Sequence, residues 1–157
     1  MEVEIYTDGS SRGNPGPGGY GIVMIYGKNR KQLSQGFKLT TNNRMELMAI
    51  IVALESLKSN KYKVHIFSDS KYVIDSITKG WLYKWNRNNF KGKKNKDLWL
   101  KYLKVSGEYK IRYTWVKGHA GNAENERCDT LAVEAAEVGP WEVDDGYEKE
   151  NSSGMFD

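Results

Sequence analysis

The feature that most constrains the fold is a stretch of the chain that is apolar on almost every side. Ten of the thirteen residues from Met45 to Leu57 are apolar, and the stretch contains neither Gly nor Pro. Thirteen residues are too many for a typical strand, and a helix of this composition has no polar face to turn toward water. The sequence therefore predicts a helix that is buried on most of its surface.

Shorter alternating or apolar runs, bounded by turn residues, predict the elements around this helix. The predicted strands are residues 3–7, 20–26, 32–39, 64–67 and 110–116, and the further helices are residues 71–79, 81–88, 97–105 and 125–136. Three strands come first, and the later strands alternate with helices. This order indicates an α/β fold with a mixed sheet, in which an antiparallel hairpin is followed by parallel crossovers.

Length and composition limit the organisation of the chain. Its 157 residues favour one domain. Gly139-Pro140 ends the last predicted helix, and residues 137–157 carry seven acidic residues against one basic residue. We therefore expect a catalytic domain of residues 1–138, followed by an acidic, mobile C-terminal tail of residues 139–157.

Nothing in the sequence predicts a membrane or secretory protein. The longest apolar run, Leu47 to Leu54, has eight residues, whereas a membrane-spanning helix needs about 18 or more. The N-terminus lacks the basic and apolar regions of a secretory signal, and the single cysteine, Cys128, fits a reducing compartment. We expect a cytoplasmic protein with no membrane partner, and we expect a monomer because no exposed apolar helix is predicted.

One segment is strongly basic. Residues 79–112 hold eleven basic residues against two acidic ones, and Trp81, Trp85, Phe90 and Trp99 lie among them. This pattern suits a polyanionic partner such as nucleic acid. The alternative is a solvated helical face whose aromatic side chains turn inward, and charge alone does not separate the two interpretations.

Two acidic residues follow predicted strands. Asp8 and Asp69 each lie at the C-terminal end of one, where open α/β sheets place their ligand sites. Carboxylates meeting there would repel each other unless a pKa rises or a cation binds. Each also has a local explanation, because Asp8-Gly9 is a common turn pair and Asp69 or Ser70 can cap the next helix.

Two further acids lie on predicted helices. Glu46 is in the first turn of the apolar helix, where it could complete a capping box with Asn43, or lie near the sheet and need a metal. Asp129 borders the apolar face of the last helix, and its default interpretation is a surface acid. One cysteine and two histidines are too few for a structural zinc site, so carboxylate ligands would favour magnesium or manganese.

Six motifs in a fixed order resemble those of type 1 ribonuclease H, the bacterial ribonuclease HI, over residues 2–136. The motifs are Thr7-Asp8-Gly9-Ser10, Gly13-Asn14-Pro15-Gly16-Pro17-Gly18-Gly19, Thr40-Thr41-Asn42-Asn43-Arg44-Met45-Glu46-Leu47, Ser68-Asp69-Ser70-Lys71-Tyr72-Val73, Trp115-Val116-Lys117-Gly118-His119-Ala120-Gly121 and Glu124-Asn125-Glu126-Arg127-Cys128-Asp129. The acidic tail departs from the family pattern.

The resemblance implies a ribonuclease H-like fold, with a five-stranded mixed sheet flanked by helices. It also implies an endonuclease that cleaves the RNA strand of RNA–DNA hybrids. Asp8, Glu46, Asp69 and Asp129 match the metal-binding acids of the family, and His119 matches a loop histidine that assists proton transfer or product release. Three groups of residues match substrate contacts of the family. Contacts largely on the RNA side match Asn14, Asn42, Asn43 and Lys71, and a contact with a DNA phosphate lies near Thr41 and Asn95. The basic protrusion of the family matches residues 79–96, with Trp81, Trp85 and Lys94.

Physical chemistry agrees with this assignment. Four acids together can hold two Mg²⁺ ions about 3.5–4 Å apart, the arrangement used for in-line phosphoryl displacement, with Mn²⁺ as a possible substitute. The expected products carry a 5′-phosphate and a 3′-hydroxyl. A histidine with a pKa near 6.5 can move a proton at neutral pH, although His119 could also be a loop residue without a role.

Two other functions remain open. The chain could be a catalytically silent module that binds hybrids, although the presence of all four acids speaks against this. It could also be an integrase-like enzyme of the same fold that acts on DNA. The basic segment and the pair Asn42-Asn43 favour the hybrid.

Overall fold

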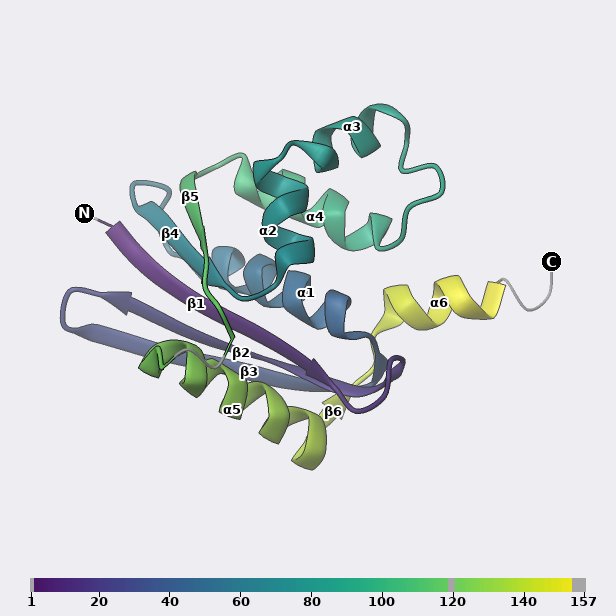
Figure 1. Cartoon of the computed structure of the whole chain (residues 1–157), viewed down its shortest axis with the longest axis horizontal. Coiled ribbons are helices and arrows are strands. Elements are labelled where there is room, and N and C mark those ends of the chain that lie inside the picture. Colours follow the sequence, from purple (N-terminus) through teal and green to yellow (C-terminus); the bar gives the residue numbers. More distant parts are fainter. Residues whose placement is uncertain (1, 119–120, 154–157) are drawn as a thin grey trace.

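The computed structural model describes residues 2–118 and 121–153, and it contains a mixed sheet flanked by helices (Figure 1). The strand order is β5-β4-β1-β2-β3-β6. The strands are β1 (Glu2–Ser11), β2 (Gly16–Tyr26), β3 (Asn29–Thr40), β4 (Lys63–Ser68), β5 (Lys110–Trp115) and β6 (Trp141–Glu142). β1, β2 and β3 form an antiparallel meander, whereas β4 and β5 extend the sheet in parallel beyond β1. The predicted α/β layout is therefore confirmed.

Helix α1 (Asn42–Glu55) explains why the central stretch of sequence is apolar all round. It packs against β1 and β2 on one side and against α4 (Lys96–Ser106) on the other. Leu47, Ile50 and Leu54 are completely buried. Two short helices, α2 (Lys71–Thr78) and α3 (Trp81–Arg87), lie on the same side of the sheet (Figure 1). A helix between two layers is covered on most of its surface, so the predicted burial is confirmed.

Helix α5 (Ala123–Val138) covers the opposite face of the sheet (Figure 1). It lies very close to β2, because a Cβ atom on Gly21 would overlap the carbonyl oxygen of Cys128. Asp8 pairs with Gly21 across β1 and β2. The close packing therefore holds Asp129, the residue after Cys128, near the strand that carries Asp8.

Three expectations from the sequence differ from the structure. The sheet has six strands rather than five, because the two-residue β6 pairs in parallel with β3. β1 runs to Ser11, so Asp8 lies within the strand and not at its end. Thr41 caps α1 through a hydrogen bond from the Arg44 amide to its Oγ1 (3.3 Å), so Asn43 and Glu46 do not form the capping box.

The segment after residue 138 contains more structure than the sequence suggests. Besides β6, it forms the helix α6 (Asp145–Ser153). Between the two elements, Asp144 is only 3% exposed and forms an ion pair with Arg44 of α1. Residues 141–153 therefore contain regular structure that the sequence analysis did not predict, whereas the mobility of the tail and the domain boundary at residue 138 stay predictions. Within the described ranges, every helix is too short or too polar to cross a membrane.

Candidate active site

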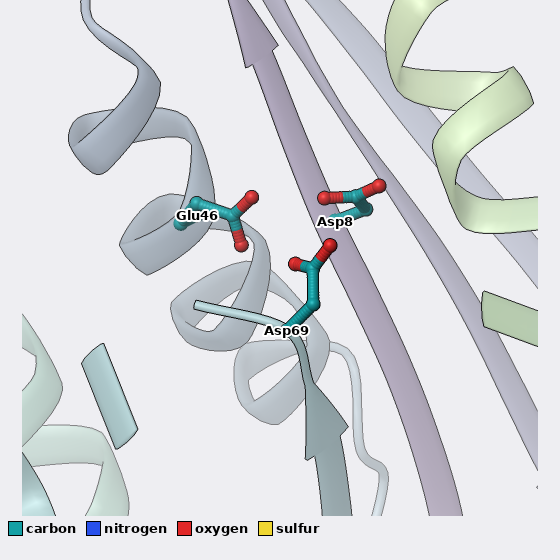
Figure 2. A group of neighbouring side chains, drawn as sticks. All are labelled: Asp8, Glu46 and Asp69. Atoms are coloured by element: carbon teal, nitrogen blue, oxygen red, sulfur yellow. The ribbon is translucent and has the colours of Figure 1, made fainter. Parts of the chain in front are cut away.

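Asp8 of β1, Glu46 of α1 and Asp69, which follows β4, converge (Figure 2). One carboxylate oxygen of each residue lies within 4.8 Å of the others. The ladder between β1 and β4 ends at the pair Thr7 and Ser68, while β1 continues alongside β2. Asp8 and Asp69 are the next residues of their two segments, so they meet where β4 ends. The structure therefore brings together the two acids that follow predicted strands in the sequence.

Gly9 allows Glu46 to join them. A Cβ atom at this position would lie 2.5 Å from the Glu46 amide nitrogen, so only glycine lets β1 and the first turns of α1 approach this closely. The Gly9 amide donates to Asp8 Oδ1 and to Glu46 Oε1, at 2.9 Å in both cases. One backbone N–H thus holds two carboxylates that would otherwise repel each other.

The cluster is electrostatically costly in the absence of a cation. Asp8 is 4% exposed and Glu46 is 3% exposed. Burial raises the pKa of Asp8 to about 7, and the charge of Asp69 adds to this, although hydrogen bonding with Glu46 opposes it. Burial and the neighbouring Asp8 also raise the pKa of Glu46 well above its ordinary value. In the metal-free protein both carboxyl groups therefore hold their protons to a higher pH than they would in water.

The donor set fits a divalent metal ion. Glu46 Oε2 is buried, and no hydrogen-bond donor of the described residues reaches it. Carboxylate oxygens are the ligands that Mg²⁺ and Mn²⁺ prefer, and a bound cation would offset both the burial and the mutual repulsion. Several carboxylates share the site, so together they can bind more positive charge than a single carboxylate can.

Asp129 lines the same cavity but is not one of the three converging residues. The cavity has a volume of about 430 Å³, and Asp8, Glu46, Asp69 and Asp129 all contribute to its walls. Asp129 is partly exposed, and its charge helps to raise the pKa of Asp8. The structure therefore places all four predicted acids around one cavity. The predicted His119 lies outside the described residues.

Amide side chains border this cavity. Asn42 and Asn43 are exposed at the start of α1 and line it. Asn14, which is also exposed, accepts a hydrogen bond from the Asn42 amide through Oδ1 (3.0 Å). This contact fixes the turn between β1 and β2 relative to α1, so the three predicted amides form one surface.

A lysine borders the other side of the cavity. Lys71, at the start of α2, is exposed, and its Nζ lies 4.8 Å from the centre of the Trp115 ring. Trp115 in turn donates from Nε1 to the carbonyl oxygen of Asp69 (3.0 Å). The predicted lysine and the predicted metal ligand are therefore connected through one tryptophan.

The predicted contacts in the basic segment fall into two groups. Trp81 is 44% exposed and Lys94 is exposed, so both are accessible. Trp85 packs edge to face on the buried Trp99. Asn95 is only 8% exposed, and both ends of its side chain are engaged: Oδ1 accepts from Arg44 (3.4 Å), and Nδ2 donates to the Tyr72 hydroxyl (3.1 Å). The side chain of Asn95 thus supports the site from within.

Sequence reasoning missed three contributors to this site. The Gly9 amide binds two of the carboxylates, but sequence reasoning explains Asp8-Gly9 only as a turn pair and assigns this amide no role in the site. Tyr72 lines the cavity and accepts hydrogen bonds from Asn95 and Trp99, and only its position after Lys71 could have indicated this. Asp144 binds Arg44, two residues before Glu46, but nothing distinguishes it in sequence from the acids around it.

Comparisons with known proteins agree with this geometry. The family described as RNase H matches residues 1–137. A protein of Trichodesmium erythraeum named "Ribonuclease H" is 51% identical over 152 residues, which cover 94% of this chain and 96% of that protein.

Solved structures have the same fold. LC9-RNase H1, described as a type 1 RNase H with the type 2 active-site motif, is 32% identical with a TM-score of 0.80, and the match covers 96% of this chain and 80% of that one. LC11-RNase H1, solved in complex with an RNA/DNA hybrid, is 28% identical with a TM-score of 0.67, and the match covers 86% of this chain and 96% of that one.

Proposed function

Because this chain belongs to the ribonuclease H family, we propose that it hydrolyses the RNA strand of RNA–DNA hybrids with the help of two divalent metal ions. The observation that carries the proposal is the convergence of Asp8, Glu46 and Asp69, with a buried Glu46 oxygen that no donor of the described residues reaches. Such an arrangement is unfavourable for folding alone, and it suits a protein that binds cations at this point.

Asp8, Glu46, Asp69 and Asp129 would hold the ions. When bound, Mg²⁺, or Mn²⁺ in its place, supplies an activated water and charge stabilisation for the leaving 3′-oxygen, so that the products carry a 5′-phosphate and a 3′-hydroxyl. The chain keeps the carboxylates oriented through the Gly9 amide, which is already in place before substrate arrives. His119 is proposed to move a proton during the reaction or to help release the product.

RNA is selected, in our proposal, through its 2′-hydroxyl groups. The wide minor groove of an A-like duplex presents these groups to short polar side chains. Asn14, Asn42 and Asn43 are exposed, and two of them line the acid cavity, so their amides can read a 2′-hydroxyl next to the reacting phosphate. Lys71, beside Trp115, would contact the same strand.

The DNA strand would bind along the start of α1 and the basic protrusion of residues 79–96. Thr41 accepts a hydrogen bond from the Arg44 amide, which leaves its hydroxyl proton to donate to a phosphate. Trp81, Trp85 and Lys94 would add contacts, and Asn95 would act mainly by holding Arg44 and Tyr72 in place. Such phosphate contacts supply affinity that weakens as salt increases. A monomeric state and a cytoplasmic location remain part of this proposal.

A cleavage assay tests the proposal directly. A hybrid labelled on the RNA strand is incubated with the purified chain, with and without Mg²⁺, beside duplex DNA and duplex RNA. We expect magnesium-dependent cleavage of the RNA in the hybrid alone. Binding of the hybrid without cleavage would instead indicate a silent module, and cleavage of duplex DNA would indicate a DNA-acting enzyme of the same fold.

A further inference from the structure

The C-terminal helix α6 is tied firmly to the helix that carries Glu46. Asp144, immediately before α6, accepts hydrogen bonds from Arg44 Nε (2.8 Å) and Nη2 (2.9 Å) and from the Thr40 hydroxyl (2.7 Å). The Tyr147 amide donates to Asp144 Oδ1 (3.3 Å), so the same carboxylate also caps α6. The position of α6 is therefore set by the buried contacts of the domain.

This anchoring makes α6 one wall of a second cleft, of about 240 Å³. On the domain side, the cleft is lined by Asn14, Pro15, Thr41, Asn43, Lys94 and Asn95. On the α6 side, it is lined by Tyr147, Glu150 and Asn151. Figure 1 shows α6 beside the beginning of α1, on the side where the loop between α3 and α4 projects. Among the residues on the domain side, the proposed function assigns Thr41 and Lys94 to the DNA strand and Asn14 and Asn43 to the RNA, so the cleft lies within the proposed hybrid-binding surface.

The two walls differ in charge. The domain side offers the Lys94 ammonium together with amide and hydroxyl groups, a set that attracts a phosphate. The opposite side offers the Glu150 carboxylate, on a helix that also carries Asp145 and Glu148. A phosphate drawn to Lys94 therefore comes close to a negative charge that belongs to the protein.

We propose that α6 is the outer wall of the hybrid-binding surface on the side of the DNA strand, and that Glu150 limits the affinity for the sugar–phosphate backbone there. This inference rests on the proposed function, which supplies the substrate. Glu150 would determine affinity without touching the reacting groups, because it does not line the cavity of the metal-binding acids. The chain thereby opposes some of the attraction that its basic segment exerts.

The substitution Glu150→Gln tests this inference, because it removes the charge and keeps the shape. Steady-state cleavage of the hybrid by the full chain should show KM lowered about two- to fivefold at low salt, the size expected of an exposed charge interaction, without a matching change in kcat. Glu150→Lys should lower KM further. Both effects should shrink toward 1 M salt, where charges are screened within about 3 Å.

Glu108→Gln is the matched control, since Glu108 is exposed in the turn before β5, outside both clefts. It loses the same charge and should leave KM unchanged. An unchanged or raised KM for Glu150→Gln, a decrease equal to that of Glu108→Gln, or a decrease that persists at 1 M salt would each overturn the inference. If the wild-type chain cleaves the hybrid, these outcomes contradict only the inference about Glu150, and the proposed function stands. If the wild-type chain does not cleave the hybrid, both the proposed function and the inference fail.

Discussion

The acid cluster of Asp8, Glu46 and Asp69 and the basic segment of residues 79–112 carry opposite charges and are built in opposite ways. The acids come from distant parts of the chain, and two of them are almost completely buried. The eleven basic residues are close in sequence, and all of them are exposed. Burying a charge costs free energy unless a partner compensates it, whereas an exposed charge costs little and contributes little to stability. The comparison predicts that the acids control catalysis and pH-dependent stability, and that the lysines control affinity.

Asp8→Asn should have the largest effect of any single substitution. It removes a carboxylate that shares the Gly9 amide with Glu46 but keeps its volume, so cleavage should fall by at least about a thousandfold, which corresponds to about 4 kcal/mol of transition-state stabilisation. The fold should stay intact, and hybrid binding should be largely kept. Magnesium-dependent cleavage and circular dichroism measure the two properties. Near-normal cleavage by Asp8→Asn would contradict the assignment of Asp8 as a metal ligand. Glu108→Gln serves as the control for the loss of one acidic side chain.

The metal-free protein should lose stability as the pH rises. The pKa of Asp8 is raised from about 4 in an unfolded chain to about 7 by burial and by Asp69, and that of Glu46 is also raised. A raised pKa favours folding below the unfolded value, and that contribution disappears as the pH passes through the folded value. For Asp8 the loss between about pH 4 and pH 8 is at most about 4 kcal/mol.

Thermal unfolding in the presence of a chelator, at pH 5 and pH 8, measures this loss. Asp8→Asn should flatten the pH dependence and raise Tm at pH 8, because the amide has no charge to bury. The same pH dependence in the variant and the wild-type protein would show that the cluster is not responsible. Alanine substitutions in the basic segment provide the contrast, since exposed lysines should leave the pH dependence unchanged.

Asp144→Asn extends the comparison to a buried ion pair outside the cluster. Breaking a buried pair costs about 3–5 kcal/mol, but Arg44 keeps its bonds to Asp97 (2.7 and 2.8 Å), so we expect a loss of about 2–3 kcal/mol. Tm should fall by about 4–12 °C. Glu124→Gln, which breaks the partly exposed pair with Arg30, should lower Tm far less than Asp144→Asn does. Equal losses would mean that residues 139–153 contribute little to the stability of the domain.

The basic segment can be predicted from local sequence, whereas the acid cluster cannot, because its residues meet only in the folded chain. Helix α1 and the strands follow from apolar periodicity, which is a local property, and the basic segment is visible as composition. Each acid taken alone also fits a turn, a cap or the surface, and only the resemblance of six motifs brings the four together. The pair of Arg44 and Asp144 joins residues 100 positions apart in sequence, and no local pattern records it. For the same reason β6 and the docked α6 were not foreseen.

Substitution of four lysines in the basic segment should have the smallest effect on chemistry and tests the other half of the comparison. Replacing Lys91, Lys93, Lys94 and Lys96 by Ala should raise KM for the hybrid by about tenfold, or 1.4 kcal/mol, and change kcat little, because these groups bind ground state and transition state alike. The salt dependence of binding should weaken as well. Four lost phosphate contacts would lower the slope of log K against log salt by up to about 3.6.

We expect a decrease of about half that size, because two of the lysines already have partners in the protein. Lys93 Nζ lies 5.2 Å from the centre of the Trp85 ring, and Lys96 Nζ donates to Asn89 Oδ1 (2.8 Å). The double variant of Lys91 and Lys94 should therefore account for most of the change in slope, and the double variant of Lys93 and Lys96 for little. An unchanged slope in the fourfold variant would identify the segment as a solvated face. A lower kcat at constant KM would show that the segment shapes the acid cavity, and the distinction between the two regions would then fail.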